Sequence, residues 1–418
     1  MPASQPDADR RRFLRAGFAA GIVSIAGCLG LSEEGLDHGE SDSEEADEEE
    51  PTEVETEEVE TEEFEVETVA DGFTHPWGLA FLPDDPVLLV TEREGELSLL
   101  DRDDGSVRTV DGVPEVYSVG QGGLLDVTLH PDFPHERWVY LTYSATNDDG
   151  ESATHVGRGE LDVADGRLAE FERLHVAEPF VERTGHFGSR VVFDEDGYLY
   201  VTTGDRQFKD FGPDHVSQDL TNELGVTLRL EPDGSVPEDN PFADDPDARD
   251  AIYTYGPRNA QGMTVHPETG ELWQSEHGER DGDEINVIQR GGNYGWPVTH
   301  YGCTYAEGEP IGDEPHELDD VVDPVYYWEC NTGGFPPAGA TFYDGDAFPT
   351  WEGDLFVGNL AGQYLGRFLV NGTDVREVDP LLADRGWRVR DVAVAPDTGY
   401  LYVAIDDEDA PVVRLVPA

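Results

Sequence analysis

One histidine has the surroundings expected of a proton-transfer group. His186 lies in Gly185-His-Phe-Gly-Ser-Arg190, between glycines and directly before a predicted strand. An imidazole titrates near neutrality and is the usual general base for a hydroxyl proton, and glycine lets a ligand approach the backbone closely. A single loop histidine is more often structural, so the catalytic interpretation depends on the side chains that converge on it.

Arg258 and Asn259 precede another predicted strand, in Tyr255-Gly-Pro-Arg-Asn-Ala-Gln-Gly262. Arginine is a permanently charged fork that suits a carboxylate or a developing oxyanion, and asparagine offers both a donor and an acceptor. For any single arginine in so acidic a chain, an internal salt bridge is the alternative. Several arginines on one rim favour a bound anion.

Arg388 and Arg390 alternate along a strand-like stretch, so we expect both side chains to point the same way. Two parallel guanidinium groups form an anion-binding pair unless Asp384 or Asp391 neutralises them. Long-range repulsion of an anion by this acidic chain is weak in molar salt, because the screening length there is about 3 Å.

The turn Glu276-His-Gly-Glu-Arg-Asp-Gly-Asp-Glu284 is dense in oxygen atoms. Ca²⁺ takes about six to eight oxygen ligands, backbone carbonyls included. The spacing is not that of an EF-hand loop, and an acidic turn on an acidic protein needs no metal. Gln121 and Asp126 can orient a polyol, whereas the aromatic turn from Asn293 to Pro297 is better explained by packing.

A pattern that occurs six times must position these residues: a short apolar run, Pro/Asp/Gly turn residues and a second apolar run. Period-2 apolar runs around turn residues predict β-hairpins. Six hairpins at spacings of roughly 50 to 80 residues predict an all-β fold, a six-bladed β-propeller with four-stranded antiparallel blades. The hairpins begin near Leu79, Val127, Val191, Met263, Thr341 and Val392.

The segments just before the hairpins should occupy equivalent places on one rim of the central channel. They would bring glutamine, aspartate, histidine, asparagine and arginine side chains to one mouth. The segments are His75–Gly78, Gly120–Asp126, Gly185–Arg190, Gly256–Gly262, Pro336–Ala340 and Arg388–Asp391. The long stretches 204–255 and 297–340 are predicted to be loops over one face.

The chain has 418 residues, with 92 acidic and 26 basic side chains and a net charge of -66. The only lysine is Lys209. This excess of carboxylate repels nucleic acid and anionic membranes. It indicates a solvated acidic surface adapted to high salt, while the abundant aromatic and turn residues after residue 70 exclude a disordered acidic protein.

The N-terminus predicts export. Arg10-Arg-Arg-Phe-Leu-Arg15 has a twin-arginine layout, and the apolar stretch Ala16–Gly27 is too short to span a bilayer. Cys28 ends a lipobox-like sequence and is the predicted lipid anchor to the outer face of the cell membrane, with cleavage without lipid as the alternative. We expect a signal segment at 1–28, an acidic linker at 29–65 and the propeller domain at 66–418.

Two further cysteines, Cys303 and Cys330, lie in loop-like surroundings between the fourth and fifth hairpins. In an exported protein a disulfide between them is plausible, and the sequence leaves the pairing open. Without matching histidine spacing they do not predict a zinc site.

With these residues, almost all of 70–408 resembles the soluble PQQ-dependent aldose sugar dehydrogenases, the family that includes soluble glucose dehydrogenase. The motifs are specific only in combination. They are Gly120-Gln-Gly-Gly-Leu-Leu125, Leu129-His-Pro-Asp-Phe133, His186-Phe-Gly-Ser-Arg190, Tyr255-Gly-Pro-Arg-Asn-Ala-Gln-Gly262, Asp283-Glu-Ile-Asn286, Asn293-Tyr-Gly-Trp-Pro297 and Arg388-Val-Arg-Asp391.

The resemblance implies a propeller that binds pyrroloquinoline quinone (PQQ) and Ca²⁺ at the channel mouth and oxidises aldoses at C1 to lactones. It implies that His186 takes the proton of the C1 hydroxyl while hydride passes to the quinone, and that Arg258 stabilises the resulting oxyanion. Backbone carbonyls of Gly278 and Glu279 would hold Ca²⁺, which acts on the quinone as a Lewis acid.

The resemblance also implies the residues that would bind the cofactor: Gln121, Asn259, Arg388 and Arg390. The two arginines would hold the carboxylates of the quinone, and Gln121 would also help to seat the sugar. The physiological electron acceptor stays open.

The chain departs from the family pattern in several places. Pro257, Ala260 and Glu279 stand where the family usually has His, Pro and Pro. Gly185 replaces an acid found in glucose dehydrogenase, which leaves the preferred aldose open. A cofactor-binding lysine seen in some members is absent from Asn359–Gln363, so carboxylate binding would depend more on the two arginines.

Two other functions remain possible from the sequence. A propeller lactonase would use a channel Ca²⁺ to activate water, but it needs several acidic ligands from different blades, and these segments are rich in arginine. A non-catalytic propeller would recognise glycans or another exported protein.

Overall fold

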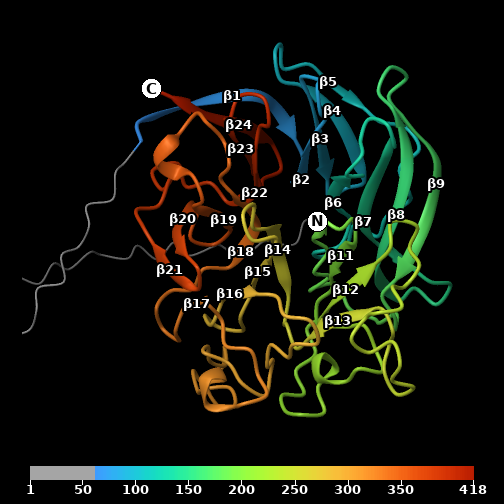
Figure 1. Cartoon of the computed structure of the whole chain (residues 1–418), viewed down its shortest axis with the longest axis vertical. Helices are drawn as coiled ribbons and strands as arrows, with labels where there is room; N and C mark the ends of the chain where they lie inside the picture. Colours follow the sequence, from blue (N-terminus) through green and yellow to red (C-terminus); the bar gives the residue numbers. More distant parts are fainter. Residues whose placement is uncertain (1–61) are drawn as a thin grey trace, which may run out of the picture. The chain divides into compact units, whose positions relative to one another are not determined.

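Each predicted hairpin forms the inner half of a four-stranded antiparallel sheet in the computed structural model, which describes residues 62–418 (Figure 1). The first three blades comprise β2 (Pro76–Phe81), β3 (Val87–Glu92), β4 (Glu96–Asp101), β5 (Val107–Thr109), β6 (Leu124–Leu129), β7 (Trp138–Thr146), β8 (Ser152–Asp162), β9 (Arg167–Val176), β10 (Val191–Phe193), β11 (Leu199–Thr202), β12 (Val226–Leu230) and β13 (Ile252–Tyr255). The six-bladed propeller prediction is confirmed.

The remaining three blades follow the same order, except that the last one takes a strand from the start of the domain. They comprise β14 (Ala260–Val265), β15 (Leu272–Glu276), β16 (Glu284–Val287), β17 (Tyr326–Tyr327), β18 (Pro337–Phe342), β19 (Leu355–Asn359), β20 (Tyr364–Asn371), β21 (Asp374–Glu377), β22 (Val389–Val394), β23 (Leu401–Ile405), β24 (Ala410–Pro417) and β1 (Phe64–Phe73).

The ring is closed by the two ends of the domain. β1 pairs antiparallel with β24, from Phe64 opposite Pro417 to Phe73 opposite Ala410. Because β1 starts at Phe64, the last two residues of the predicted linker belong to the propeller. The predicted signal segment, the Cys28 anchor and the linker up to residue 61 lie outside the described residues.

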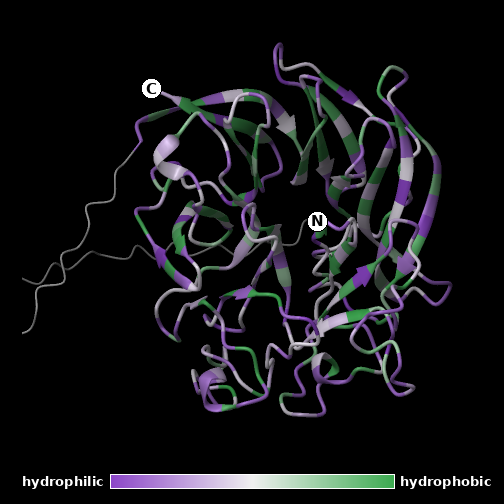
Figure 2. Ribbon diagram, viewed as in Figure 1, coloured by the Kyte–Doolittle hydropathy of each residue, from purple (hydrophilic) through white to green (hydrophobic). Residues whose placement is uncertain are grey.

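The innermost strands β2, β6, β10, β14, β18 and β22 contact their neighbours around the ring and surround the central channel. Apolar side chains fill the spaces between blades, as where Leu89 and Leu99 of the first blade pack with Leu141 of the second. The strands carry most of the hydrophobic residues and the loops most of the polar ones (Figure 2). Full burial of one such leucine stabilises the fold by about 1.5–3 kcal/mol, so these interfaces hold the blades together.

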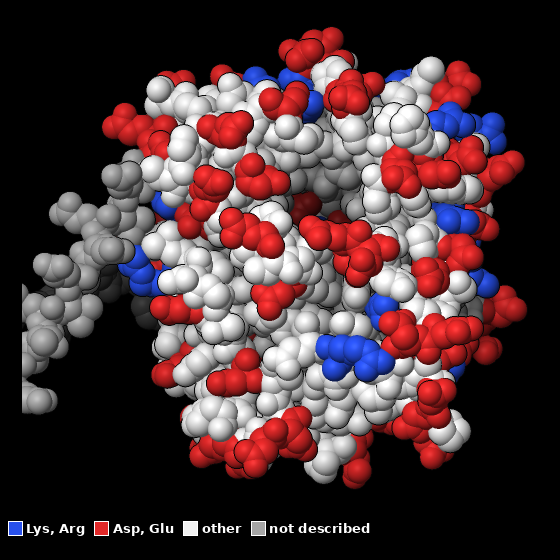
Figure 3. Space-filling model, in the orientation of Figure 1, with Lys and Arg blue, Asp and Glu red and all other residues white. Residues whose placement is uncertain are grey.

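The prediction that 204–255 and 297–340 are loops is only partly right, because the first stretch contains β12 and β13, and the second contains β17 and the start of β18. Between β11 and β12 lies the 3-10 helix η1 (Val216–Gln218), and between β16 and β17 lies η2 (Pro315–Glu317); η3 (Pro349–Trp351) precedes β19. Within residues 62–418 no helix is long and apolar enough to cross a membrane. Acidic side chains are spread over the face shown in Figure 3, and basic ones gather in small groups.

Candidate active site

His186 is held in a defined orientation by two neighbours. It has a φ of 49° in the left-handed region, its backbone N–H donates to Gln121 Oε1 at 2.7 Å, and its ring Nδ1 lies 2.6 Å from Asp205 Oδ1. Trp296 Nε1 donates to the other oxygen of Asp205 at 2.9 Å. Because Nδ1 is engaged by the carboxylate, Nε2 is the ring atom left to accept a proton.

The charge state of this pair suits a general base. Burial, followed by the positive charge of Arg258, lowers the pKa of His186, and the hydrogen bond that its ring donates to Asp205 opposes this only in part. Burial alone would raise the pKa of Asp205, but His186 and Arg258 lower it below its usual range. The arrangement is therefore a neutral imidazole beside an ionised carboxylate at neutral pH.

Arg258 lies in the same cluster and is held by acids. Its backbone C=O accepts the N–H of Asp205 at 2.8 Å, its backbone N–H donates to Glu276 at 2.6 Å, and its Nη2 donates to Glu279 Oε2 at 2.6 Å. Glu279 also pairs with Lys209. The salt-bridge alternative therefore holds for part of this guanidinium, while its buried Nε has no protein partner.

Asn259 presents an unused donor. Its Oδ1 accepts the N–H of Gly188 at 3.1 Å, and its Nδ2 is buried without a protein partner. The same is true of Arg258 Nε and Arg390 Nε in the described part of the chain. Buried polar atoms are usually paired, so this group of orphaned donors fits a bound ligand rich in acceptor oxygens.

Arg388 and Arg390 do point toward one place, as predicted, but the acid that joins them was missed. Arg388 Nη2 and Arg390 Nη2 lie 3.1 and 2.9 Å from the same oxygen of Asp406. Neither of the two acids predicted to neutralise the arginines does so: Asp391 pairs with Arg190 at 3.0 Å, and Asp384 lies beside Arg385. One carboxylate shared by two guanidinium groups leaves a local excess of positive charge.

Some of these residues line a cavity of about 310 Å³ at one mouth of the channel, near the lower end of the range for small-molecule sites. Gln121, His277, Arg388 and Arg390 contribute to its wall. His186 is not among the wall residues, but its backbone N–H donates to Oε1 of Gln121, which is. A larger hollow of about 1010 Å³ on the outside of the fifth blade contains none of the predicted site residues, so we place the site by its chemistry and not by volume.

Gly278 and Glu279, the predicted metal ligands, lie in the turn between β15 and β16. Asp283 Oδ1 accepts the N–H of Gly278 at 3.0 Å, and His300 Nε2 accepts that of Glu279 at 3.2 Å. Within residues 62–418 neither carbonyl oxygen accepts a hydrogen bond. The side chains described form no cluster of three acids, histidines or cysteines suited to a metal, so the calcium prediction depends on these backbone oxygens, which hard cations accept.

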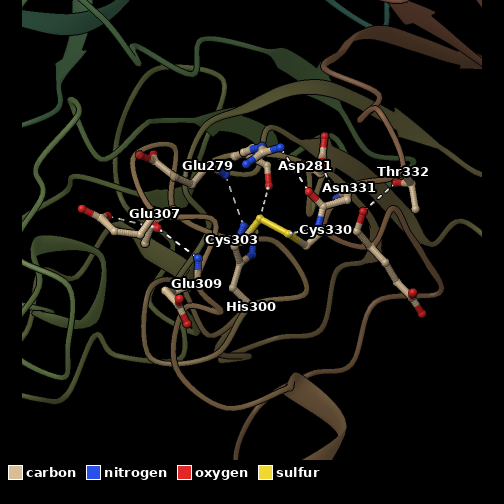
Figure 4. The surroundings of a disulfide bond; sticks show 12 residues. Glu279, Asp281, His300, Cys303, Glu307, Glu309, Cys330, Asn331 and Thr332 are labelled. Carbon is tan, nitrogen blue, oxygen red and sulfur yellow. Dashed lines mark hydrogen bonds between the residues drawn. A yellow bond between two sulfur atoms is a disulfide. The ribbon is translucent and has the colours of Figure 1, made fainter.

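The two cysteines whose pairing the sequence left open form a disulfide. Cys303 and Cys330 are joined with their Cα atoms 5.6 Å apart (Figure 4). Asn331 and Asp281 lie next to the bond in the same view.

The six-bladed propeller, the His186–Asp205 pair and the arginines at the cavity fit the class of sugar-oxidising propellers that the motifs resemble. Residues 73–414 match the model of the family described as "Glucose / Sorbosone dehydrogenase". The chain belongs to this family.

Several relatives agree with this assignment. Aldose sugar dehydrogenase YliI of Escherichia coli (strain K12) is 40% identical over 353 residues, covering 84% of this chain and 92% of the relative. Quinoprotein glucose dehydrogenase B of Acinetobacter calcoaceticus is 28% identical, covering 81% and 85%.

Two solved structures are similar over nearly their whole length. The apo-form of the soluble aldose sugar dehydrogenase from E. coli has a TM-score of 0.80 at 39% identity, covering 85% of this chain and 100% of that chain. The PQQ-bound form of aldose sugar dehydrogenase from Streptomyces coelicolor has a TM-score of 0.67 at 28% identity, covering 85% and 99%.

Proposed function

We propose that this protein is a PQQ- and calcium-dependent dehydrogenase that oxidises aldoses at C1 to lactones. Membership of the glucose/sorbosone dehydrogenase family and the PQQ-bound relative support sugar oxidation with this cofactor. The observation that carries the proposal is the His186–Asp205 pair, which a hydrogen bond joins to Gln121 in the wall of the cavity that also carries Arg388 and Arg390.

His186 would act as the base. Its Nε2 would take the proton of the C1 hydroxyl, while Asp205 keeps Nδ1 protonated and fixes the ring plane. When bound, PQQ accepts the hydride that leaves C1, and Ca²⁺ polarises it as a Lewis acid. Loss of a proton from the C1 hydroxyl and of a hydride from C1 of a cyclic aldose yields the lactone.

The remaining residues would bind the cofactor. Arg388 and Arg390 would hold its carboxylates, because one positive charge of the pair is not compensated by Asp406. Asn259 Nδ2 would donate to an acceptor oxygen, as would Arg258 Nε, which lies near the base. The free carbonyl oxygens of Gly278 and Glu279 would hold Ca²⁺. The side chain of Gln121 would position His186 by accepting its backbone N–H, and it would also contact the ligand.

The proposal is tested by reconstitution. Purified protein is titrated with PQQ and Ca²⁺ in molar salt and assayed with a dye acceptor against a panel of aldoses. We expect aldose-dependent dye reduction that requires both additions. Absence of dye reduction together with absence of a quinone absorbance change would refute it, and lactone hydrolysis without PQQ would favour the lactonase.

We further propose that the protein is exported and anchored through a lipid on Cys28. The twin-arginine layout of Arg10–Arg15 and the lipobox-like sequence before Cys28 support this. Mass spectrometry of the mature N-terminus tests it, and an unmodified start beyond Cys28 would contradict the anchor.

A further inference from the structure

The loop between β15 and β16, residues 277–283, lies between two other segments of the chain, and we call it the carbonyl loop. Its first wall is the segment from His300 to Cys303 (Figure 4). Arg280 and Cys303 exchange both backbone hydrogen bonds, at 3.0 and 3.1 Å. The N–H of Glu279 donates to His300 Nε2 at 3.2 Å.

The second wall is the segment from Trp328 to Asn331. The N–H of Gly282 donates to the carbonyl of Trp328 at 2.6 Å, and the N–H of Trp328 donates to the carbonyl of Asp283 at 3.0 Å. The N–H of Asn331 donates to a carboxylate oxygen of Asp281 at 2.5 Å. The carbonyl loop is therefore hydrogen-bonded on both sides.

The contact with the first wall is too close for any side chain to intervene. A Cβ on Gly282, whose φ is +71°, would lie 2.4 Å from the backbone nitrogen of Gly302, and a Cβ on Gly302 would lie 2.5 Å from the carbonyl oxygen of Asp281. Backbone packed directly on backbone transmits a displacement of the wall to the loop.

The chain between the two walls cannot fix their separation by regular structure. Cys303 and Cys330 are 27 residues apart in sequence, and the connection contains only the three-residue η2 and the two-residue β17. The disulfide joins the walls directly, supported by one hydrogen bond from the N–H of Cys330 to the carbonyl of Tyr301 at 3.1 Å.

We propose that the Cys303–Cys330 disulfide is a positioning element of the cofactor site. By holding both walls against the carbonyl loop, it fixes the free carbonyls of Gly278 and Glu279 and also the Glu279 carboxylate that binds Arg258 at 2.6 Å. This role rests on the proposed calcium site. Groups that support metal ligands from behind typically change metal affinity by about 10–100-fold when removed.

The test compares the full-length protein with the double variant Cys303→Ser/Cys330→Ser, and uses Thr304→Ser, the residue directly after Cys303, as the matched control that keeps the disulfide. Calcium affinity is measured by calorimetric titration in molar salt. Amide hydrogen exchange of residues 277–283 is measured without metal or PQQ. We expect calcium affinity to fall about 10–100-fold and the carbonyl loop to exchange faster, with unchanged exchange in β7 and β23.

Each other result overturns the proposal. Equal calcium affinity in the double variant, with or without faster loop exchange, would show that the disulfide supports the fold alone. If the wild-type protein binds no calcium, the proposed metal site itself is wrong. That result is distinguishable from a failure of the disulfide proposal alone, because it appears before any cysteine is changed. If the double variant does not fold, reduction of the folded wild-type protein gives the same two measurements.

Discussion

Two clusters of arginine and acidic side chains lie at the channel, and their ratios of acid to base are opposite. In the Arg190 cluster, one guanidinium lies 2.9 Å from Asp126 and 3.0 Å from Asp391. Glycines leave room for it: a Cβ on Gly78 would lie 2.6 Å from Asp126 Oδ1, and one on Gly339 would lie 1.7 Å from Asp391 Oδ1. This cluster has more acid than base and joins the inner strands of different blades.

At the channel mouth the ratio is reversed. Arg388 and Arg390, which we call the mouth pair, share the single carboxylate of Asp406. His75 Nδ1 also lies 2.8 Å from Asp406. In a protein of net charge -66, this pair therefore has more guanidinium groups than carboxylates, which is the condition that our proposed cofactor site needs.

The two ratios shift the carboxyl groups in opposite directions. Burial raises the pKa of Asp126 to about 7, with Asp391 adding to the effect and Arg190 opposing it. Burial would also raise the pKa of Asp406, but Arg390 outweighs it and holds this carboxyl below its usual range. A guanidinium shared by two acids is expected to stabilise the fold, whereas an acid shared by two guanidinium groups leaves positive charge that can bind an anion.

The largest effect should come from the mouth. Replacing the base, His186→Ala, should lower turnover about 10² to 10⁴-fold, because the variant lacks the imidazole that takes the proton of the C1 hydroxyl. Turnover is measured at saturating sugar with PQQ and Ca²⁺ bound, and circular dichroism shows that the variant is folded. Near-normal turnover would contradict the assignment of His186 as the base, and the channel mouth would then have no assigned role in the chemistry.

The Arg190 cluster should respond in stability. Arg190→Met leaves two buried carboxylates without their cation and should destabilise the protein by about 3–5 kcal/mol. Urea unfolding in constant salt measures this loss. The exposed Arg376 of β21 is the matched control, and Arg376→Met should change stability by no more than about 0.5 kcal/mol. Similar urea midpoints for the two variants would mean that Arg190 does not stabilise the fold.

The same cluster predicts the pH dependence of stability. Because the folded pKa of Asp126 is about 7 and lies above its ordinary value of 3.8, the native state binds this proton more tightly than the unfolded state. The contribution is complete below about pH 4 and is lost as the pH rises toward 7, with a ceiling of about 4 kcal/mol.

Unfolding measured between pH 4 and 7 for the wild type and for Asp126→Asn separates this contribution from that of the other acids. The slope of stability against pH should be shallower in the variant. Equal slopes would show that Asp126 is ionised throughout and that the charge ratio does not govern its proton.

The sequence predicted the six blades because their inner strands carry the period-2 pattern and turn residues. It did not place the outer strands: β5 (Val107–Thr109) is exposed along its whole length and has no face to alternate. Closure by β1 was also missed, since its partner β24 lies at the other end of the chain.

Most of the site residues that the sequence predicted lie before the first strand of a blade or at its start. Residues before the first strand of each blade reach the mouth, but so do residues after the second strand, because an antiparallel hairpin returns to the same rim. Asp205 follows β11 and Asp406 follows β23, so counting to the end of the second strand would have found both. Trp296 and the disulfide lie in long irregular loops, where no period indicates which residues meet.

The smallest effect tests the mouth pair directly. Arg390→Ala should weaken PQQ binding by about 1.5–3 kcal/mol, the contribution of a charge-assisted hydrogen bond, or roughly 10- to 150-fold. Asp406 keeps its contact with Arg388 in this variant, so the loss should fall on the ligand more than on the fold. Arg388→Ala should cost less, because that side chain is 44% exposed and water screens its charge.

Absorbance titration of the apo protein with PQQ at fixed Ca²⁺ measures both affinities, and urea unfolding of the same samples measures stability. A variant that binds PQQ normally but unfolds early would place Arg390 with Arg190 as a structural cation. The comparison would then fail at the mouth, because a charge ratio that leaves one guanidinium uncompensated would no longer identify a ligand-binding arginine in this fold.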